Sequence, residues 1–329
     1  MDLIQTNGQP RFGRFSIVPS MINIDRYEYR TEKGQSVTGW RKRLKYKKYK
    51  FCSIQHEDYI IGLTIADVSW AGYGAFYIYN YKTQETLHWS ALNLLSRKTR
   101  LDEQPLFNHS YFHNSPFQIQ VEHANGARYI QLTKFGEIQL SARIFCAGTQ
   151  PLSLCKPNGA NGWIYTQQLM TLNCEGFFID KSGEIIQFQD HTFVSLNDTC
   201  GFLKSDTNWR RLSSSFLVDQ HRIGFNLRLN DMDEQHNENC LWVNRQLYTL
   251  SDVHIEQLDS AQWHIYSLDH SIDIKVMLQG RHSEHLNLRW VNHQLEHWTA
   301  KISGKIQYND QEILFENEKG IFEKQEAKI

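Results

Sequence analysis

The stretch from His221 to Trp290 is built of short runs in which every second residue is apolar, with a turn after each run. Its apolar positions are Ile223, Phe225, Leu227 and Leu229, Val253 and Ile255, Trp263 and Ile265, Ile272, Ile274, Val276 and Leu278, and Leu286, Leu288 and Trp290. A period of two places these side chains on one face of a pleated sheet. Such a long antiparallel meander must close or stack to bury that face and to lose its edges.

The same pattern fills the first half of the chain, where turn signals separate the expected strands. Asn125-Gly126, a strong hairpin dipeptide, lies between strands expected at Phe117–His123 and Arg128–Lys134. Ser36–Lys48 is either a short helix or an irregular basic segment, and other helical signals are weaker. With roughly one strand every ten residues, the sequence predicts an all-β fold made of sandwiches or barrels. Further turns are expected at Lys181–Gly183, Asn244–Arg245, Asp269–His270 and Asn309–Asp310.

The length of the chain, 329 residues, is enough for two domains of ordinary size. The polar stretch Asn197–Arg211 marks a shift in composition near the middle. We therefore predict an N-terminal domain over residues 1–200 and a C-terminal domain over residues 201–329.

Composition excludes several classes of protein. Lys and Arg total 35 against 36 Asp and Glu, and this balance argues against nucleic acid or an acidic membrane as a partner. No apolar run approaches about 18 residues, so no transmembrane segment is expected. Met1–Arg14 is polar and shows no secretory signal. The six cysteines form no C-x-x-C pair and lie mostly in apolar segments, which favours reduced thiols and a cytoplasmic location.

Six segments follow one another in a recognisable order and spacing. They are Gly62–Gly74, Asn197–Phe202, Asn208–Arg210, Arg222–Leu227, Glu238–Asn244 and Trp263–Ile265. Together they resemble a bacterial family known as domain of unknown function 2804. That family is similar to a wider group of tandem lipocalin-like proteins, which includes AttH, carotenoid 1,2-hydratases, fungal survival factors and some pericyclases. The resemblance implies two tandem lipocalin-like antiparallel β-barrel domains, with a ligand cleft in a barrel or between the two.

The hydratases of that group carry an Asp-His-Glu-x-Gly type of motif at the start of the second unit. This chain has Asn197 in place of the Asp and Asp198 in place of the His. An imidazole that could shuttle a proton near neutral pH is therefore missing. We therefore rank hydratase activity below ligand binding as the function of this chain.

Asp67, Trp70 and Tyr73 form one candidate site, in a glycine-rich segment after an expected strand. In a pocket wall, the indole would stack on a ligand, the carboxylate would fix its polar end, and the glycines would let the backbone approach closely. The alternative is a β-bulge at a barrel corner with Trp70 in the core, and glycine within a strand favours this alternative.

Asp198, Trp209 and Arg210 form a second candidate site, in the polar stretch between the two halves. The fork of the Arg210 guanidinium suits a ligand carboxylate or phosphate. The alternative is an interdomain salt bridge between Asp198 and Arg210, with Trp209 buried beside it.

Asn226 and Arg228 share the strand face opposite the apolar row. The sequence does not tell whether that face looks into a barrel or at solvent, and the same holds for Asn239 and Trp242. If that face lines a barrel lumen, these residues are polar groups in a ligand pocket. If it faces solvent, they are ordinary surface residues.

The basic run Trp40–Lys50 contains interleaved aromatic residues, which can hold RNA or an anionic membrane. The alternative, favoured by the balanced net charge, is a solvated loop or short helix over a barrel end, with Trp40 and Leu44 packed inward. The closest histidine pairs do not suit a metal: His282 and His285, three positions apart, would lie on opposite faces of a strand, and His293 and His297 have even spacing but no third ligand in register. No metal and no cofactor is therefore predicted.

Three hypotheses of function follow. The first is binding of a small hydrophobic or amphipathic molecule, such as a lipid or an isoprenoid. The second is an enzyme of the hydratase, isomerase or cyclase type, in which Asp67 or Asp198 is an acid with a pKa raised by burial. The third is a stress or interaction protein whose solid barrels are scaffolds with an exposed apolar patch. The ligand-binding residues expected under the first hypothesis are Asp67, Trp70, Tyr73, Trp209, Arg210, Asn226, Asn239 and Trp242.

Overall fold

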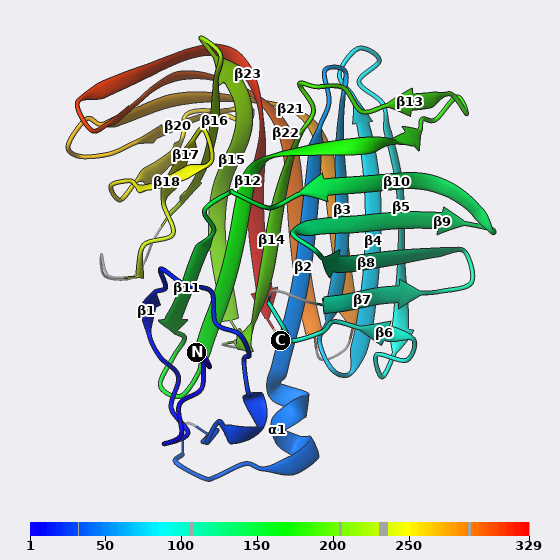
Figure 1. Ribbon diagram of the computed structural model, residues 1–329, viewed down its shortest axis with the longest axis vertical. Helices are drawn as coiled ribbons and strands as arrows, with labels where there is room; N and C mark the ends of the chain where they lie inside the picture. Colours follow the sequence, from blue (N-terminus) through cyan, green and yellow to red (C-terminus); the bar gives the residue numbers. More distant parts are fainter. Residues whose placement is uncertain (32, 106–107, 204–205, 230–235, 289–290, 329) are drawn as a thin grey trace. The chain divides into compact units, whose positions relative to one another are not determined.

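The computed structural model describes residues 1–31, 33–105, 108–203, 206–229, 236–288 and 291–328 (Figure 1). The chain forms two compact units. Each unit contains one curled antiparallel sheet, so the predicted all-β fold of two barrel-like sheets is confirmed. The first unit consists of Met1–His56, Ile61–Ile78 and Leu87–Lys204, and the second of Glu57–Ile60, Tyr79–Thr86 and Ser205–Ile329.

The sheet of the first unit follows the neighbour order β5-β4-β3-β2-β14-β12-β10-β9-β8-β7-β6, with β11 and β13 paired to β12 and β1 paired to β11. Its strands are β1 (Gly13–Arg14), β2 (Tyr46–Gln55), β3 (Tyr59–Asp67), β4 (Ala71–Asn80), β5 (Thr86–Leu94), β6 (Thr99–Arg100), β7 (Asn108–His113), β8 (Phe117–Ala124), β9 (Ala127–Lys134), β10 (Glu137–Phe145), β11 (Leu152–Pro157), β12 (Trp163–Ile179), β13 (Ile185–Gln187) and β14 (Phe193–Phe202). Two short helices, η1 (Ile24–Arg26) and α1 (Gly39–Lys45), precede β2.

This sheet curls until its two ends approach each other. In Figure 1, strands β7–β10 cross in front of β2–β5. The Asn93 amide on β5 donates to Thr99 Oγ1 and to the carbonyl of His113, both at 3.1 Å, and the Asn114 amide donates to Asn93 Oδ1 at 2.8 Å. Side-chain hydrogen bonds therefore link the two ends of the sheet.

The alternation of side chains explains the interior of the first unit. On β8, Phe117, Ile119 and Val121 are buried and the residues between them are exposed. The predicted hairpin at Asn125-Gly126 is confirmed: both residues have positive φ, 53° and 72°, and join β8 to β9. The apolar row of β8 continues into buried His123, so the interior becomes polar near this turn.

Gly176 shows how tightly the strands of this sheet approach. It lies on β12 at φ +125°, and a Cβ atom there would overlap the carbonyl oxygen of Ser141 on the neighbouring strand β10. Gly176→Ala should therefore lower the free energy of unfolding by at least about 2 kcal/mol. Gly183→Ala is the matched control, because Gly183 also has positive φ but open space around it, and strain alone costs about 1 kcal/mol. Urea denaturation measures both changes, and equal losses would contradict the prediction.

The sheet of the second unit follows the order β18-β17-β16-β15-β23-β22-β21-β20-β19. Its strands are β15 (Asp206–Val218), β16 (His221–Arg228), β17 (Cys240–Val243), β18 (Gln246–Thr249), β19 (His254–Gln257), β20 (Gln262–Tyr266), β21 (Ile272–Leu288), β22 (Val291–Tyr308) and β23 (Gln311–Lys328). The predicted turns at Asn244–Arg245, Asp269–His270 and Asn309–Asp310 are confirmed, since each joins two paired strands or contains residues of positive φ.

Apolar side chains fill the inner face of this second sheet. The rings of Phe216, Phe225 and Phe315 lie with their centroids 5.1–6.1 Å apart, and Trp263 packs on Phe322 at 4.9 Å. The predicted inward row of His221–Trp290 is confirmed through Val276. The side chains of Leu286, Leu288 and Trp290 lie outside the described residues. The interior of this unit is an apolar core, as expected for side chains that alternate along each strand.

The short helix predicted in the basic run is confirmed, but the side chains that it buries differ from the prediction. It forms α1 and the start of β2, but Trp40 and Leu44 are 67% and 41% exposed, so their predicted inward packing is wrong. The buried residue of α1 is Lys42, whose Nζ donates to the carbonyls of Ile24, Asp25 and Tyr27 at 3.0–3.1 Å. None of the described helices is long and apolar enough to span a membrane.

Candidate functional site in the first unit

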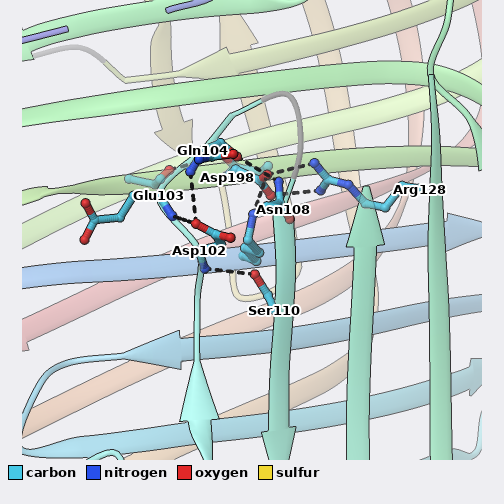
Figure 2. Close-up of polar contacts among 10 residues, drawn as sticks. Asp102, Glu103, Gln104, Asn108, Ser110, Arg128 and Asp198 are labelled. Atoms are coloured by element: carbon cyan, nitrogen blue, oxygen red, sulfur yellow. Dashed lines mark hydrogen bonds and ion pairs between the residues drawn. The ribbon is translucent and has the colours of Figure 1, made fainter. Parts of the chain in front are cut away.

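Three charged side chains from three strands meet inside the first unit, and we call them the Lys50–Asp198–Arg128 triad. Asp198 on β14 lies opposite Lys50 on β2 in the strand register, so both side chains project from one face of the sheet. Lys50 Nζ donates to Asp198 Oδ2 at 2.8 Å. Arg128 on β9 donates to both carboxylate oxygens, at 2.9 and 2.8 Å (Figure 2). The side chains of Lys50, Asp198 and Arg128 are 10%, 15% and 3% exposed, so their charges are largely removed from water.

The strand periodicity explains why charges stand at these positions. In each of the three strands, the charged residue continues a row of buried side chains two positions away. These neighbours are Cys52 on β2, Ile130 on β9 and Leu196 on β14. The triad thus occupies the polar end of an otherwise apolar interior.

The electrostatics of the triad are unbalanced. Burial alone would raise the pKa of Asp198, but Arg128 and Lys50 outweigh burial and hold that pKa well below its usual range. Burial lowers the pKa of Lys50, and Arg128 lowers it further, against the attraction of Asp198. One carboxylate therefore faces two cations. The expectation that burial raises the pKa of Asp198 and makes it an acid is wrong, because the neighbouring cations keep it ionised.

A small hollow of about 40 Å³ lies beside the triad. Its wall combines the rings of Tyr46, Tyr49 and Tyr165 with the polar side chains of Lys50, Gln167 and Asp198. Since a cavity needs roughly 10–15 Å³ to hold one water molecule, the hollow has room for about three waters or for one small polar group.

A loop beside the hollow is fixed by its own polar contacts (Figure 2). Asp102 Oδ1 accepts hydrogen bonds from the backbone N–H groups of Glu103 and Gln104, at 2.8 and 3.4 Å. The Asp102 N–H donates to Ser110 Oγ at 3.2 Å, and the Asn108 amide donates to the carbonyl of Gln104 at 3.1 Å. These contacts hold Asp102, Glu103 and Gln104 on the wall of the hollow.

Several buried polar atoms around the triad have no hydrogen-bond partner within the described chain. They are Arg128 Nε, Gln167 Oε1, Asn108 Oδ1 and His123 Nδ1. Burial, with Arg128 adding to it, lowers the pKa of His123 to about 4, so its imidazole is neutral near pH 7. Buried polar groups are normally satisfied by protein or by bound water. A water molecule or a polar ligand group at this end would satisfy these atoms.

Comparison with known proteins identifies the family. The model of the family described as "Domain of unknown function (DUF2804)" matches residues 21–329. The chain belongs to the DUF2804 family. A search of curated protein sequences finds no match.

Two solved structures resemble this DUF2804 chain. Kievitone hydratase from Nectria haematococca has a TM-score of 0.50 and 9% sequence identity, over 85% of this chain and 88% of the hydratase. CghA, whose structure was solved with Sch210972, has a TM-score of 0.52 and 9% identity, over 99% of this chain and 98% of CghA. At such low identity the likeness concerns the fold, and it agrees with the predicted lipocalin-like architecture.

The first predicted candidate site lies in the same unit as the triad but outside the wall of the hollow. Asp67 ends β3, and its Oδ1 accepts hydrogen bonds from the Ser69 N–H and the Ser96 hydroxyl at 2.8 and 2.7 Å. Its Oδ2 lies 3.5 Å from Lys48 Nζ. Trp70, in the bend between β3 and β4, and Tyr73, on β4, are both half-buried. The structure does not bring these residues to the triad's hollow.

Trp209 and Arg210 lie on β15 of the second unit. The guanidinium carbons of Arg211 and Arg228 lie 5.4 and 5.1 Å from the centre of a Trp209 ring, which is a cation–π arrangement. Asp198 has two ionic partners within the first unit, Lys50 and Arg128, and the predicted interdomain salt bridge between Asp198 and Arg210 stays a prediction.

Asn226, Asn239 and Trp242 are buried within the second unit. Asn226 Nδ2 donates to the carbonyl of Glu238 at 3.0 Å, and Asn239 Oδ1 accepts from the Arg228 N–H at 2.7 Å. These contacts join neighbouring segments of one sheet. They give the two asparagines structural partners, while their proposed role in ligand binding stays a prediction.

Sequence reasoning missed Glu103, Gln167, Lys50 and Arg128. Of these, Glu103 has the environment that was expected for Asp198: burial raises the pKa of Glu103, although Lys48 opposes this shift.

The described residues contain no group of three or more His, Cys, Asp or Glu side chains suited to a metal ion. The side chains of His285 and His293 lie outside the described residues.

The triad makes a prediction for acid stability. The pKa of Asp198 is lower in the folded chain than its ordinary value of about 3.9, so the unfolded chain binds more protons as the pH falls. The contribution of Asp198 to stability is therefore present above about pH 5 and is lost progressively below it. Urea denaturation at several pH values should show a steeper loss in the wild type than in Asp198→Asn. Parallel profiles for the two proteins would contradict this prediction.

Proposed function

We propose that this DUF2804 chain binds a small amphipathic molecule in its first unit. The polar end of the molecule fills the hollow beside the Lys50–Asp198–Arg128 triad, next to the tyrosine rings of its wall, and its apolar part extends from the open side of the hollow. The observation that carries this proposal is the set of unpaired buried polar atoms around the triad. In the second unit, apolar side chains fill most of the inner face of the sheet, and the unpaired buried atoms there, such as Trp263 Nε1 and Arg210 Nε, line no comparable hollow among the described residues.

The wall of the hollow suits such a ligand. Tyrosine rings bury large apolar surfaces at a small cost in side-chain entropy, and Ile22 and Leu101 add aliphatic surface. Ligand pockets typically combine an apolar wall with a few polar groups that fix orientation. The structural neighbour CghA was solved with Sch210972, which supports a small-molecule role for this fold.

The direct experiment is extraction of the purified full-length chain with organic solvent, followed by mass spectrometry. The wild type should release one enriched compound or compound class. Lys50→Met should release less than a tenth of that amount, because it removes a polar group from the wall of the hollow. Lys45→Met is the matched control, since Lys45 is exposed and lies outside the wall. A wild type that stays empty and also binds no amphipathic probe would overturn the proposal.

A second candidate function is catalysis of a hydration or isomerisation in the same hollow, with Glu103 as the acid. The observation that favours it is the raised pKa of the Glu103 carboxyl, because an acid poised closer to neutral pH donates a proton more effectively. Incubation with α,β-unsaturated ketones and isoprenoid alkenes, followed by mass spectrometry, would reveal addition of one water. Glu103→Gln should abolish that product without lowering ligand release in the extraction experiment, because the amide keeps the size of the side chain on the wall of the hollow. A product that persists in Glu103→Gln would remove Glu103 from the mechanism.

A further inference from the structure

We infer that the ligand of the first unit ends in a single negative charge, such as a carboxylate, which pairs with the ammonium group of Lys50. This inference rests on the proposed function and specifies the chemical class of the ligand.

The hydrogen bonds of the triad show which cation is in surplus. Arg128 meets Asp198 with two parallel N–H···O bonds, the fork-to-fork pairing that matches a guanidinium to a carboxylate (Figure 2). That pair is neutral by itself. Lys50 brings a second positive charge to the same carboxylate, so the triad carries one cation more than it has anions.

Lys50 also has unused hydrogen-bonding capacity. An ammonium group has three N–H donors, and the Lys50 ammonium has one side-chain partner among the described residues, Asp198 Oδ2. Lys50 lines the hollow, so the remaining donors have space beside them. Lys50 shares its one carboxylate partner with Arg128, and an anion in the hollow would give the Lys50 ammonium a partner of its own.

Gln167 adds a second group for the same end of the ligand. It is 5% exposed, it lies opposite Asp198 in the register of β12 and β14, and it is part of the wall of the hollow. Its Oε1 has no partner within the described chain. A side-chain amide can turn to present either its oxygen or its NH₂ group, so Gln167 can donate to one carboxylate oxygen while Lys50 binds the other.

The surrounding charges limit the ligand to one negative charge. Lys48, the next cation on the same strand face, already lies 3.5 Å from Asp67 Oδ2 and donates to the carbonyl of Leu101 at 2.9 Å. Glu103 stands on the wall of the hollow as a further acidic group. A dianion such as a phosphate monoester would exceed the surplus charge of the triad and meet repulsion from Asp198 and Glu103.

Calorimetric titration of the full-length chain with matched probes tests this inference. The probes are 3-phenylpropanoate and 3-phenyl-1-propanol, which share the apolar part, and octanoate and 1-octanol as an aliphatic pair. The acid of each pair should bind at least ten times more tightly than its alcohol. Lys50→Met should reduce this ratio to about one, and Lys50→Arg, which keeps the charge, should retain a preference for the acid. Lys45→Met should leave the ratio unchanged.

Each outcome decides between the two proposals. Equal affinity for acid and alcohol would overturn the anionic end group and leave binding of an amphipathic molecule intact. An acid preference that persists in Lys50→Met would show that Lys50 is not the partner of the anion and would also overturn the inference. Binding of neither member of either pair, together with an empty extract, would overturn both proposals. Circular dichroism of each variant confirms that the sheets are formed before its titration is interpreted.

Discussion

Replacing Asp198 with asparagine should lower the free energy of unfolding by about 3–5 kcal/mol. The change keeps the size of the side chain but removes the only negative charge of the triad. Arg128 and Lys50 would then face each other in a buried place without a carboxylate between them. Such uncompensated charges are costly because they have lost most of their contact with water. Urea denaturation of the full-length chain at pH 7, followed by circular dichroism, measures the loss.

Two further variants separate the charge effect from other causes. Asp25→Asn is the matched control, because Asp25 pairs with Arg43 at 3.0 Å on the exposed surface, and its loss should stay within about 0.5 kcal/mol. Lys50→Met combined with Asp198→Asn should recover part of the stability, because the double variant buries one cation fewer. If Asp198→Asn costs no more than Asp25→Asn, the triad does not stabilise the fold.

Alternation along single strands made the architecture predictable from the sequence. The row from Ile223 to Val276 and the hairpin at Asn125-Gly126 depend on contacts between near neighbours, and local patterns carry that information. The pairing of β2 with β14 is different, because Lys50 and Asp198 lie 148 positions apart. Alternation does not specify which distant strands pair, so the contact between Asp198 and Lys50 was not predicted.

The triad itself left a weaker signal that was available in the sequence. Lys50 lies two and four positions before the apolar residues Cys52 and Ile54, and Asp198 lies two positions after Leu196. In each strand the charged residue is therefore expected on the same face as the apolar ones. A charged residue in register with an apolar row predicts a charge that faces the interior. The basic composition of Trp40–Lys50 concealed this signal, because a run of positive charges usually lies in solvent. The sign of the pKa shift of Asp198 was beyond sequence reasoning, since it depends on the two cations that the fold brings to the carboxylate.

A second buried ion cluster, in the second unit, makes the other large prediction. Glu323 on β23 lies between Arg211 on β15 and His297 on β22 in the strand register. Arg211 Nε donates to Glu323 Oε2, and His297 Nε2 lies 3.3 Å from Glu323 Oε1. The Glu323 side chain is 0% exposed. Burial alone would raise the pKa of Glu323, but Arg211 and then His297 outweigh it and keep the pKa below its usual value.

Glu323→Gln should therefore destabilise the chain by about 3–5 kcal/mol, because it removes the carboxylate that balances a buried guanidinium. The loss should appear in urea denaturation at pH 7. Glu312→Gln is the control: Glu312 pairs with Lys305 at 3.2 Å on the surface of the same strand, and its change should have no measurable effect. A Glu323→Gln variant as stable as Glu312→Gln would mean that the buried pair contributes no more than a surface pair. Because Asp198 and Glu323 lie in different units and share no partner, the losses from Asp198→Asn and Glu323→Gln should add in the double variant.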